Sequence, residues 1–217
     1  MTSREQREAV LAATKQVPEP FYEAYPGGWP GEVGTALVDA VYSIRARYRT
    51  RDPQLGVLGR VRAFRETYPA AKDDLGSLSR VGSDDLKIVM GSGKTAGRLK
   101  SVVVLEAADS LVAAGFVRAD DVLAADPARV KNVYTAVSGL GWVTYEYFSM
   151  LLGVPGVKAD TMIVRFVNLA LAQSGLSKVN AATARDLVIA TWRESGKGAT
   201  LTHFEHALWR YQSESGA

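Results

Sequence analysis

Apolar residues recur at helical spacing along most of this chain. Leu37, Val41 and Ile44, for example, form one stripe at intervals of three and four residues, which is the period of an amphipathic helix. Serine, threonine, asparagine or aspartate precedes several of these segments, as expected for helix N-caps. The pattern predicts helices over 1–15, 35–48, 55–68, 83–90, 94–114, 120–125, 127–137, from Trp142 onward, 160–173, 181–195 and 203–212.

Patterns typical of strands are not found. No run alternates apolar and polar residues between turn residues, and the VVVL run at 102–105 lies inside a longer helical pattern. Residues 17–34 hold much of the proline and several glycines and are expected to be irregular. The sequence therefore predicts an all-α fold of about ten helices with short connections.

Composition narrows the possible functions. The 217-residue chain contains no cysteine, which excludes disulfides, thiolate zinc sites and thiolate-bound iron–sulfur clusters. A net charge of +3 allows an anionic partner without requiring one. No apolar run approaches the roughly 20 residues that span a bilayer, and the polar N-terminus lacks an apolar signal segment. We therefore expect a cytoplasmic protein without membrane contacts.

Four arginines end the helix expected over 35–48 and follow it: Arg45, Arg47, Arg49 and Arg51. On a helix Arg45 would pair with Arg49 and Arg47 with Arg51, so the four would not share one face. One interpretation is a solvated helix end, where cations suit the helix dipole. The other is a patch that faces phosphates.

The segment Gly139-Leu140-Gly141 separates two helical patterns. Glycines permit a tight turn with positive φ and keep side chains out of the approach path, and the leucine between them can insert into the core. The next helix begins near Trp142, and its first N–H groups lack intrahelical partners. Such a helix N-terminus can bind a phosphate whatever the base. A plain helix–helix turn is the structural alternative.

Asp160 stands just before the apolar pattern of the next helix. An aspartate at this position most often caps the helix. The helix N-terminus also favours the ionised carboxylate, so the capping role and a chemical role are compatible.

The segments GLGWVTYEYF and VKADTMIVRFV together resemble the helix-hairpin-helix DNA glycosylases, the superfamily of endonuclease III and of the adenine and alkylated-base glycosylases. The hairpin of that family reads Leu-x-Gly-Val-Gly-x-x-Thr-Ala. After a further helix follows Val-Asp-Thr-x-Val-x-Arg, which contains the catalytic aspartate. The matching residues here are Gly139, Leu140, Gly141, Thr144, Asp160, Thr161, Ile163 and Arg165. A fainter similarity covers residues 35–212.

Three departures from the family pattern bear on chemistry. Val143 stands where bifunctional members carry a lysine nucleophile, so no Schiff base can form there. The four-cysteine cluster of the endonuclease III branch is impossible in this chain. The glutamine of the early helix, in the element that probes the duplex, is replaced by Arg45, which leaves the way of probing DNA and the substrate open.

The resemblance implies two helical lobes with a cleft between them. One lobe would comprise 36–137, and the other would join 1–35 to 138–217 and carry both the hairpin and Asp160. Contacts with DNA are expected from the hairpin and from nearby cations, with Tyr42 and Trp29 as guesses for the base pocket. The expected DNA-binding residues are Gly139, Leu140, Gly141, Trp142, Val143, Thr144, Arg45, Arg47, Lys158 and Arg165.

The implied activity is monofunctional hydrolysis of the N-glycosidic bond of a damaged, modified or mismatched base, assisted by Asp160, in repair or against modified foreign DNA. Arg45, Lys158 or an aromatic side chain would fill the gap left by the base. The alternative is a non-catalytic helix-hairpin-helix protein that binds DNA. We expect a monomer, associated with the nucleoid when it acts on DNA, with no cofactor beyond a monovalent cation at the hairpin.

Two further patterns carry little weight. The segment MGSGKT at 90–95 is similar to a phosphate-binding loop, but Ile88 stands where the first glycine is required, and no strand is predicted before it. His203 and His206 share a helical face without an obvious third metal ligand. Neither pattern favours a nucleotide or zinc site.

Overall fold

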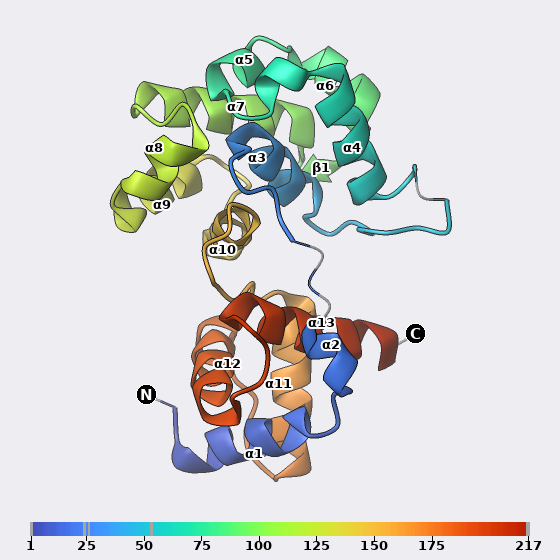
Figure 1. Cartoon of the computed structure of the whole chain (residues 1–217), viewed down its shortest axis with the longest axis vertical. Coiled ribbons are helices and arrows are strands. Elements are labelled where there is room, and N and C mark those ends of the chain that lie inside the picture. Colours follow the sequence, from blue (N-terminus) through green and yellow to red (C-terminus); the bar gives the residue numbers. More distant parts are fainter. Residues whose placement is uncertain (1, 24, 26, 53, 216–217) are drawn as a thin grey trace. The chain divides into compact units, whose positions relative to one another are not determined.

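The computed structural model describes residues 2–23, 25, 27–52 and 54–215. The chain divides into two compact units, which we call the central unit (Gly28–Val154) and the terminal unit (Met1–Gly27 with Pro155–Ala217). The described residues form thirteen α-helices, one 3₁₀ turn and one two-stranded sheet (Figure 1). The prediction of an all-α fold is confirmed.

The units differ from the lobes expected from the sequence. Residues 28–35 and the hairpin with its following helix, α10 (Trp142–Leu151), belong to the central unit. Helix α10 packs against α3 (Val33–Tyr42) and α9 (Pro127–Ala136). Phe148 and Leu151 of α10 are part of the same buried cluster as α3.

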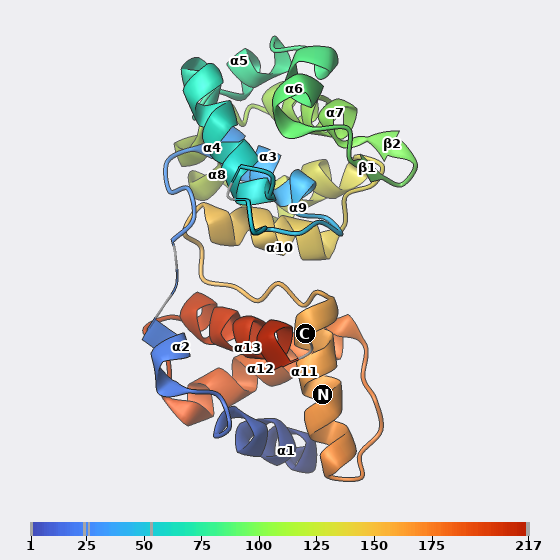
Figure 2. The ribbon, with the colours of Figure 1, turned by 90° about the vertical axis from the view of Figure 1, so that its right-hand side faces the viewer.

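Helix α3 is the axis of the central unit. All ten of its residues are buried, and α4 (Val57–Thr67), α7 (Lys100–Ala113) and α10 pack around it (Figure 2). The remaining elements of the unit are η1 (Pro69–Ala71), α5 (Leu75–Ser79), α6 (Ser83–Met90), β1 (Lys94–Thr95), β2 (Arg98–Leu99) and α8 (Ala119–Ala124).

The expected span of this central helix, 35–48, is wrong at both ends. Helix α3 begins at Val33, so Thr35 lies inside it rather than at its cap. It ends at Tyr42 because the buried Lys100 Nζ donates to the carbonyls of Tyr42 (2.9 Å) and Ile44 (2.6 Å). Arg45 then adopts a left-handed backbone (φ 49°). The four arginines therefore lie in the loop 43–56, and the expected helical pairing does not apply.

Buried Asp39 joins three segments of the central unit. Its carboxylate accepts hydrogen bonds from Trp29 Nε1 (2.7 Å), Ser43 Oγ (2.9 Å) and the hydroxyls of Tyr48 (2.9 Å) and Tyr147 (3.5 Å). These donors come from the segment before α3, from α3's C-terminal end and the loop after it, and from α10. A carboxylate in the core is tolerated because it is this well hydrogen-bonded.

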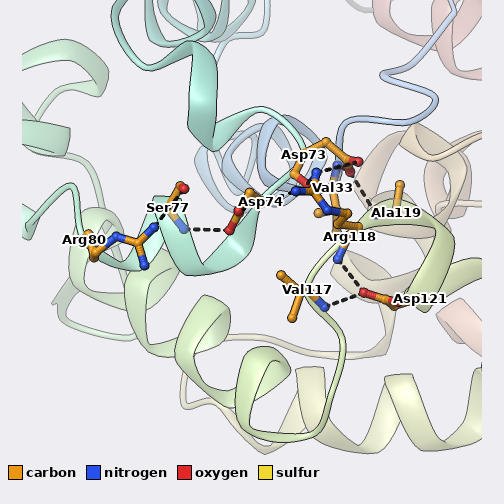
Figure 3. Close-up of polar contacts among 9 residues, drawn as sticks. All are labelled: Val33, Asp73, Asp74, Ser77, Arg80, Val117, Arg118, Ala119 and Asp121. Atoms are coloured by element: carbon orange, nitrogen blue, oxygen red, sulfur yellow. Dashed lines mark hydrogen bonds and ion pairs between the residues drawn. The ribbon is translucent and has the colours of Figure 1, made fainter.

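A second polar cluster fixes the start of α3 (Figure 3). The Asp73 carboxylate accepts the backbone N–H groups of Val33 (3.1 Å) and Ala119 (2.8 Å), which joins the first turns of α3 and α8. Asp121 accepts from the N–H groups of Val117 and Arg118, and these bonds lower the pKa of its carboxyl. The helix N-termini of this region are thus satisfied by carboxylates.

The segment around residues 94–99 forms a short β-hairpin, which the sequence did not predict. Lys94 pairs with Leu99 and Thr95 with Arg98. Ala96 (φ 48°) and Gly97 (φ 79°) both have positive φ, as a two-residue type I′ turn requires. The expected helix over 94–114 therefore begins at Lys100 instead.

The terminal unit contains α1 (Arg4–Thr14), α2 (Glu19–Glu23), α11 (Thr161–Gln173), α12 (Ala181–Ser195) and α13 (Leu201–Ser215). Helix α11 packs against α1, α12 and α13. Helix α2 lies within the stretch expected to be irregular, where Tyr22 stacks on Phe204 of α13 with ring centroids 5.7 Å apart. Over the described residues, none of the helices is long and apolar enough to cross a membrane.

We predict that Asp39→Ala lowers the free energy of unfolding by about 3 kcal/mol or more, because it leaves several buried donors without an acceptor. Denaturant unfolding measures this loss. Asp109→Ala, at an exposed site on α7, is the control and should change stability by less than about 0.5 kcal/mol. Equal effects of the two substitutions would contradict the assigned role of Asp39.

Candidate functional site

The two glycines of the turn between α9 and α10 have different backbone conformations. Gly139 has a positive φ of 97°, whereas Gly141 is extended (φ −133°, ψ 177°) and caps α10. The expectation of positive φ thus applies to the first glycine only. Leu140 between them is 7% exposed and belongs to the central core, as its position in the pattern predicted.

The β-hairpin holds this turn in place. Thr95 Oγ1 donates to the carbonyl of Gly139 (3.3 Å), and Arg98 Nη1 donates to that of Ser138 (3.3 Å). A Cβ added to Gly139 would lie 3.1 Å from Thr95 Cγ2. Arg98 is itself paired with Glu106 of α7. The MGSGKT segment, to which the sequence analysis assigned no role, therefore ends in strand β1 of the hairpin that supports this turn.

The first turn of α10 presents N–H groups to open space. Tyr145 is the first residue of the helix whose N–H reaches an intrahelical carbonyl, that of Gly141 (3.0 Å). The N–H groups of residues 142–144 precede this bond. A Cβ added to Gly141 would meet no atom within 4 Å. The helix N-terminus thus has the donors, the dipole and the open approach that an anion needs.

Asp160 occupies the N-cap of α11, which confirms the predicted capping role. Its Oδ1 accepts the N–H groups of Met162 (2.9 Å) and Ile163 (3.3 Å). Its Oδ2 accepts the indole N–H of Trp209 on α13 (3.2 Å). The residue is half-buried. Donors from two helices therefore fix the orientation of the Asp160 carboxylate.

Glu205 of α13 is a second carboxyl group in this site, and the sequence analysis missed it. Its side chain is 4% exposed. Burial raises the pKa of Glu205 well above its ordinary value of 4.5, and the charge of Asp160 raises it further. The charge and the backbone of Lys158 act in the opposite direction. Glu205 therefore holds its proton more firmly than an exposed carboxyl group does.

A signal for Glu205 was present in the sequence. It lies on the inward face of α13, among buried residues spaced by three, four and seven positions: Leu201, Phe204, Leu208 and Gln212. A carboxyl on an apolar stripe is uncommon unless it has a partner. The partner, Asp160, lies far away in the sequence, so spacing alone could not identify the pair.

Aromatic rings adjoin the Asp160 carboxylate. Trp209, its hydrogen-bond donor, stacks with His206 at 6.1 Å and an interplanar angle of 9°. Tyr25 contacts His206 (5.5 Å) and His203 (5.4 Å). All four rings are half-buried. The two histidines therefore take part in an aromatic cluster, and no group of three potential metal ligands occurs in the part of the chain that the structure describes.

The other predicted site residues divide between the two units. The hairpin residues, Arg45 and Arg47 belong to the central unit, where both arginines are exposed in the loop 43–56. Lys158, Asp160 and Arg165 belong to the terminal unit. There Lys158 is half-buried in the segment before α11, and Arg165 is exposed on α11.

The two residues guessed for a base pocket lie in the central unit. The indole N–H of Trp29 is bonded to Asp39, and its ring lies 4.8 Å from the guanidinium carbon of Arg65. Trp29 is partly buried and packs against the central core. Tyr42 is 4% exposed, and its hydroxyl donates to the Gly91 carbonyl (3.4 Å).

Comparisons with known proteins establish the fold and a family match. Residues 7–213 match the model of a family described as a domain of unknown function, DUF8548. No curated protein matches the sequence. MBOgg1 in complex with a low affinity DNA ligand has a TM-score of 0.58 at 11% identity, over 86% of this chain and 61% of that one.

A second solved structure shares the fold. The Clostridium acetobutylicum 8-oxoguanine glycosylase/lyase, in complex with double-stranded DNA containing cytosine opposite 8-oxoG, has a TM-score of 0.56 at 9% identity. The match covers 87% of this chain and 62% of that protein. This chain therefore spans less than two thirds of the length of both proteins, and identities this low establish a shared fold alone.

We predict that Glu205 makes the protein less stable as pH rises. Because the pKa of Glu205 is raised on folding, the native state binds this proton more tightly than the unfolded state, so stability falls above the ordinary value of 4.5. Glu205→Gln, a neutral isostere, should remove this contribution.

The test is the free energy of unfolding of the wild type, of Glu205→Gln and of the exposed control Glu66→Gln, measured from about pH 5 to pH 8. The difference between wild type and Glu205→Gln should grow toward alkaline pH. A difference that is constant with pH would show that Glu205 is ionised throughout.

Proposed function

Because the chain belongs to the DUF8548 family, a domain of unknown function, we propose its function from its fold and its carboxylate site. It is a divergent helix-hairpin-helix DNA glycosylase that hydrolyses the N-glycosidic bond of a damaged, modified or mismatched base. The reaction is monofunctional and leaves an abasic site. The observation that carries this proposal is the Asp160 carboxylate, which is oriented at the N-terminus of α11 in a half-buried residue.

The chemistry follows from the charge that develops at the sugar. As the base departs, C1′ becomes cationic and similar to an oxocarbenium ion. A carboxylate held in a fixed orientation stabilises that cation without reorganising, and it can also orient or deprotonate the attacking water. The Asp160 carboxylate has such a fixed orientation, because it accepts hydrogen bonds from Met162, Ile163 and Trp209.

Glu205 supports the same role. Two adjacent ionised carboxylates in a buried setting would repel each other strongly. The raised pKa of the buried Glu205 carboxyl group reduces that repulsion, because this group holds its proton more firmly. Glu205 is therefore a positioning residue, since its own side chain is buried.

The aromatic cluster offers a surface for an extruded base. A base must leave the duplex stack before its glycosidic bond can be reached, and aromatic rings compensate for part of the lost stacking. Trp209 donates to the Asp160 carboxylate, His206 stacks on Trp209, and Tyr25 extends the cluster. These rings belong to the same unit as Asp160, whereas Trp29 and Tyr42 belong to the central unit.

The hairpin supplies an anchor on the DNA backbone. The N–H groups of residues 142–144 bind a phosphate without reading the base, and Val143 offers no amine for a Schiff base. This supports hydrolysis by water over strand cleavage through a covalent intermediate. Both structural neighbours were solved in complex with DNA, which supports DNA as the partner.

We predict that Asp160→Asn abolishes base release and leaves DNA affinity unchanged or improved, because removing the charge removes stabilisation of the transition state but also a repulsion toward phosphates. Base release is measured on duplexes that carry uracil, alkylated, oxidised or mismatched bases, and affinity is measured at fixed salt. Asp186→Asn, at the neighbouring helix α12, is the control.

Two outcomes would contradict the proposal. Unchanged turnover in Asp160→Asn would show that this residue does not assist the reaction. Binding of DNA by the wild type without release from any of these substrates would favour the non-catalytic DNA-binding protein instead.

The two hairpin glycines give a matched pair of substitutions. Gly139→Ala should destabilise the protein by about 1–3 kcal/mol, because its φ is 97° and a Cβ meets Thr95. Gly141→Ala should cost less, about 0.5–1 kcal/mol, because alanine is a poorer N-cap residue than glycine but the backbone is extended and the space beside it is open.

Gly141→Ala should nevertheless weaken DNA binding by about tenfold, since a methyl group would stand before the N–H groups that bind phosphate. Thermal unfolding and DNA titration at low salt measure the two effects. DNA affinity equal to that of the wild type would remove the hairpin from the proposed interface.

A further inference from the structure

The central unit contains a cavity that the proposed chemistry does not use. It has a volume of about 410 Å³, within the range of small-molecule sites. It opens between the loop 43–56, α4 and the segment after α6. The lining residues are Tyr42, Ala46, Arg47, Thr50, Leu55, Val57, Arg60, Met90, Gly91, Ser92, Gly93 and Lys100.

The charged side chains that line this cavity in the described structure are all positive. Arg47, Arg60 and Lys100 line it, and none of the lining residues that the structure describes is acidic. Lys100 is 4% exposed, and its ammonium group donates to two backbone carbonyls. Burial lowers its pKa, and no carboxylate opposes this effect. A buried cation without an opposite charge is costly, and an anion in the cavity would supply that charge.

Gly91 allows one of these cations to approach closely. Its φ is 86°, and a Cβ added to it would lie 2.0 Å from Arg60 Nη1. Only glycine therefore leaves room for the guanidinium at this wall of the cavity. Arg60 also donates through Nε to the Leu55 carbonyl (3.4 Å), which leaves the Nη groups as its further donors.

The rest of the lining matches a ligand with an anionic end and an apolar body. Thr50 and Ser92 add hydroxyls, whereas Leu55, Val57 and Met90 add apolar surface. Leu55 is 61% exposed, so a ligand could cover it. Phosphate suits three converging cations better than a carboxylate does, because it carries more charge and more acceptor oxygens.

We propose that this cavity binds a nucleotide phosphate, with the phosphate between Arg47, Arg60 and Lys100 and the base or sugar on the apolar wall. The phosphate belongs either to a free nucleotide or to the end of a DNA strand. This inference is independent of base excision, because all its residues lie in the central unit and none is part of the Asp160 site.

The test is calorimetric titration of the full chain, without DNA, with deoxyadenosine monophosphate, deoxyadenosine and inorganic phosphate. The monophosphate should bind at least about tenfold more tightly than the uncharged nucleoside. Arg47→Ala and Arg60→Ala should each weaken it about tenfold. Arg51→Ala removes an exposed arginine of the same loop that does not line the cavity, so it should bind as the wild type does.

Competition then identifies the source of the phosphate. Displacement of the mononucleotide by a short DNA bearing a 5′-phosphate, but not by the unphosphorylated DNA, assigns the cavity to a strand end. Displacement by neither assigns it to a free nucleotide.

Three results would overturn the proposal: equal affinity for nucleoside and monophosphate, an equal loss of affinity in Arg51→Ala, or no binding of any probe at millimolar concentration. Thermal unfolding checks that each variant is folded, and base release assays report on Asp160 separately.

Discussion

The proposed chemistry depends on hydrogen bonds that orient one carboxylate. Asp160 uses one oxygen to cap α11 and the other to accept the indole N–H of Trp209 on α13. The packing of these two helices therefore determines where the charge points. The same packing buries Glu205, and this burial raises the pKa of its carboxyl group.

The central unit relies on buried polar groups in a comparable way. Asp39 accepts hydrogen bonds from three segments around α3. Lys100 donates to the carbonyl of the last residue of that helix, Tyr42, and to that of Ile44 just beyond it. Lys100 follows directly on the β-hairpin that braces the glycine turn. The same stretch of chain therefore supports both the turn that presents N–H groups at α10 and the wall of the cationic cavity.

Local signals predicted much of this structure. Asp160, Asp126 and Asn180 cap their helices with their own side chains, as their positions before apolar patterns indicated. Such bonds involve residues two or three positions apart, so they can be inferred from the sequence alone. Leu140 was expected in the core for an equally local reason, because it stands between two glycines at a helix–helix turn.

Features that depend on distant partners could not be predicted in this way. The end of α3 is determined by Lys100, which is 58 residues from Tyr42 in the sequence. Glu205 acquires its raised pKa from burial and from Asp160. The hairpin at 94–99 consists of two residue pairs, too few for an alternating pattern to emerge. The helices of the chain could thus be predicted from the sequence, whereas the residues that position its sites could not.

The central claim is that the Asp160 carboxylate and the N-terminus of α10 act on the same stretch of DNA. The most direct measurement is a crystal structure of the full chain bound to a duplex that carries an abasic-site analogue. The account predicts the Asp160 carboxylate beside C1′ of the analogue and a phosphate of the same strand on the N–H groups of residues 142–144. A complex in which Asp160 faces away from the DNA, or in which the hairpin contacts no phosphate, would contradict it.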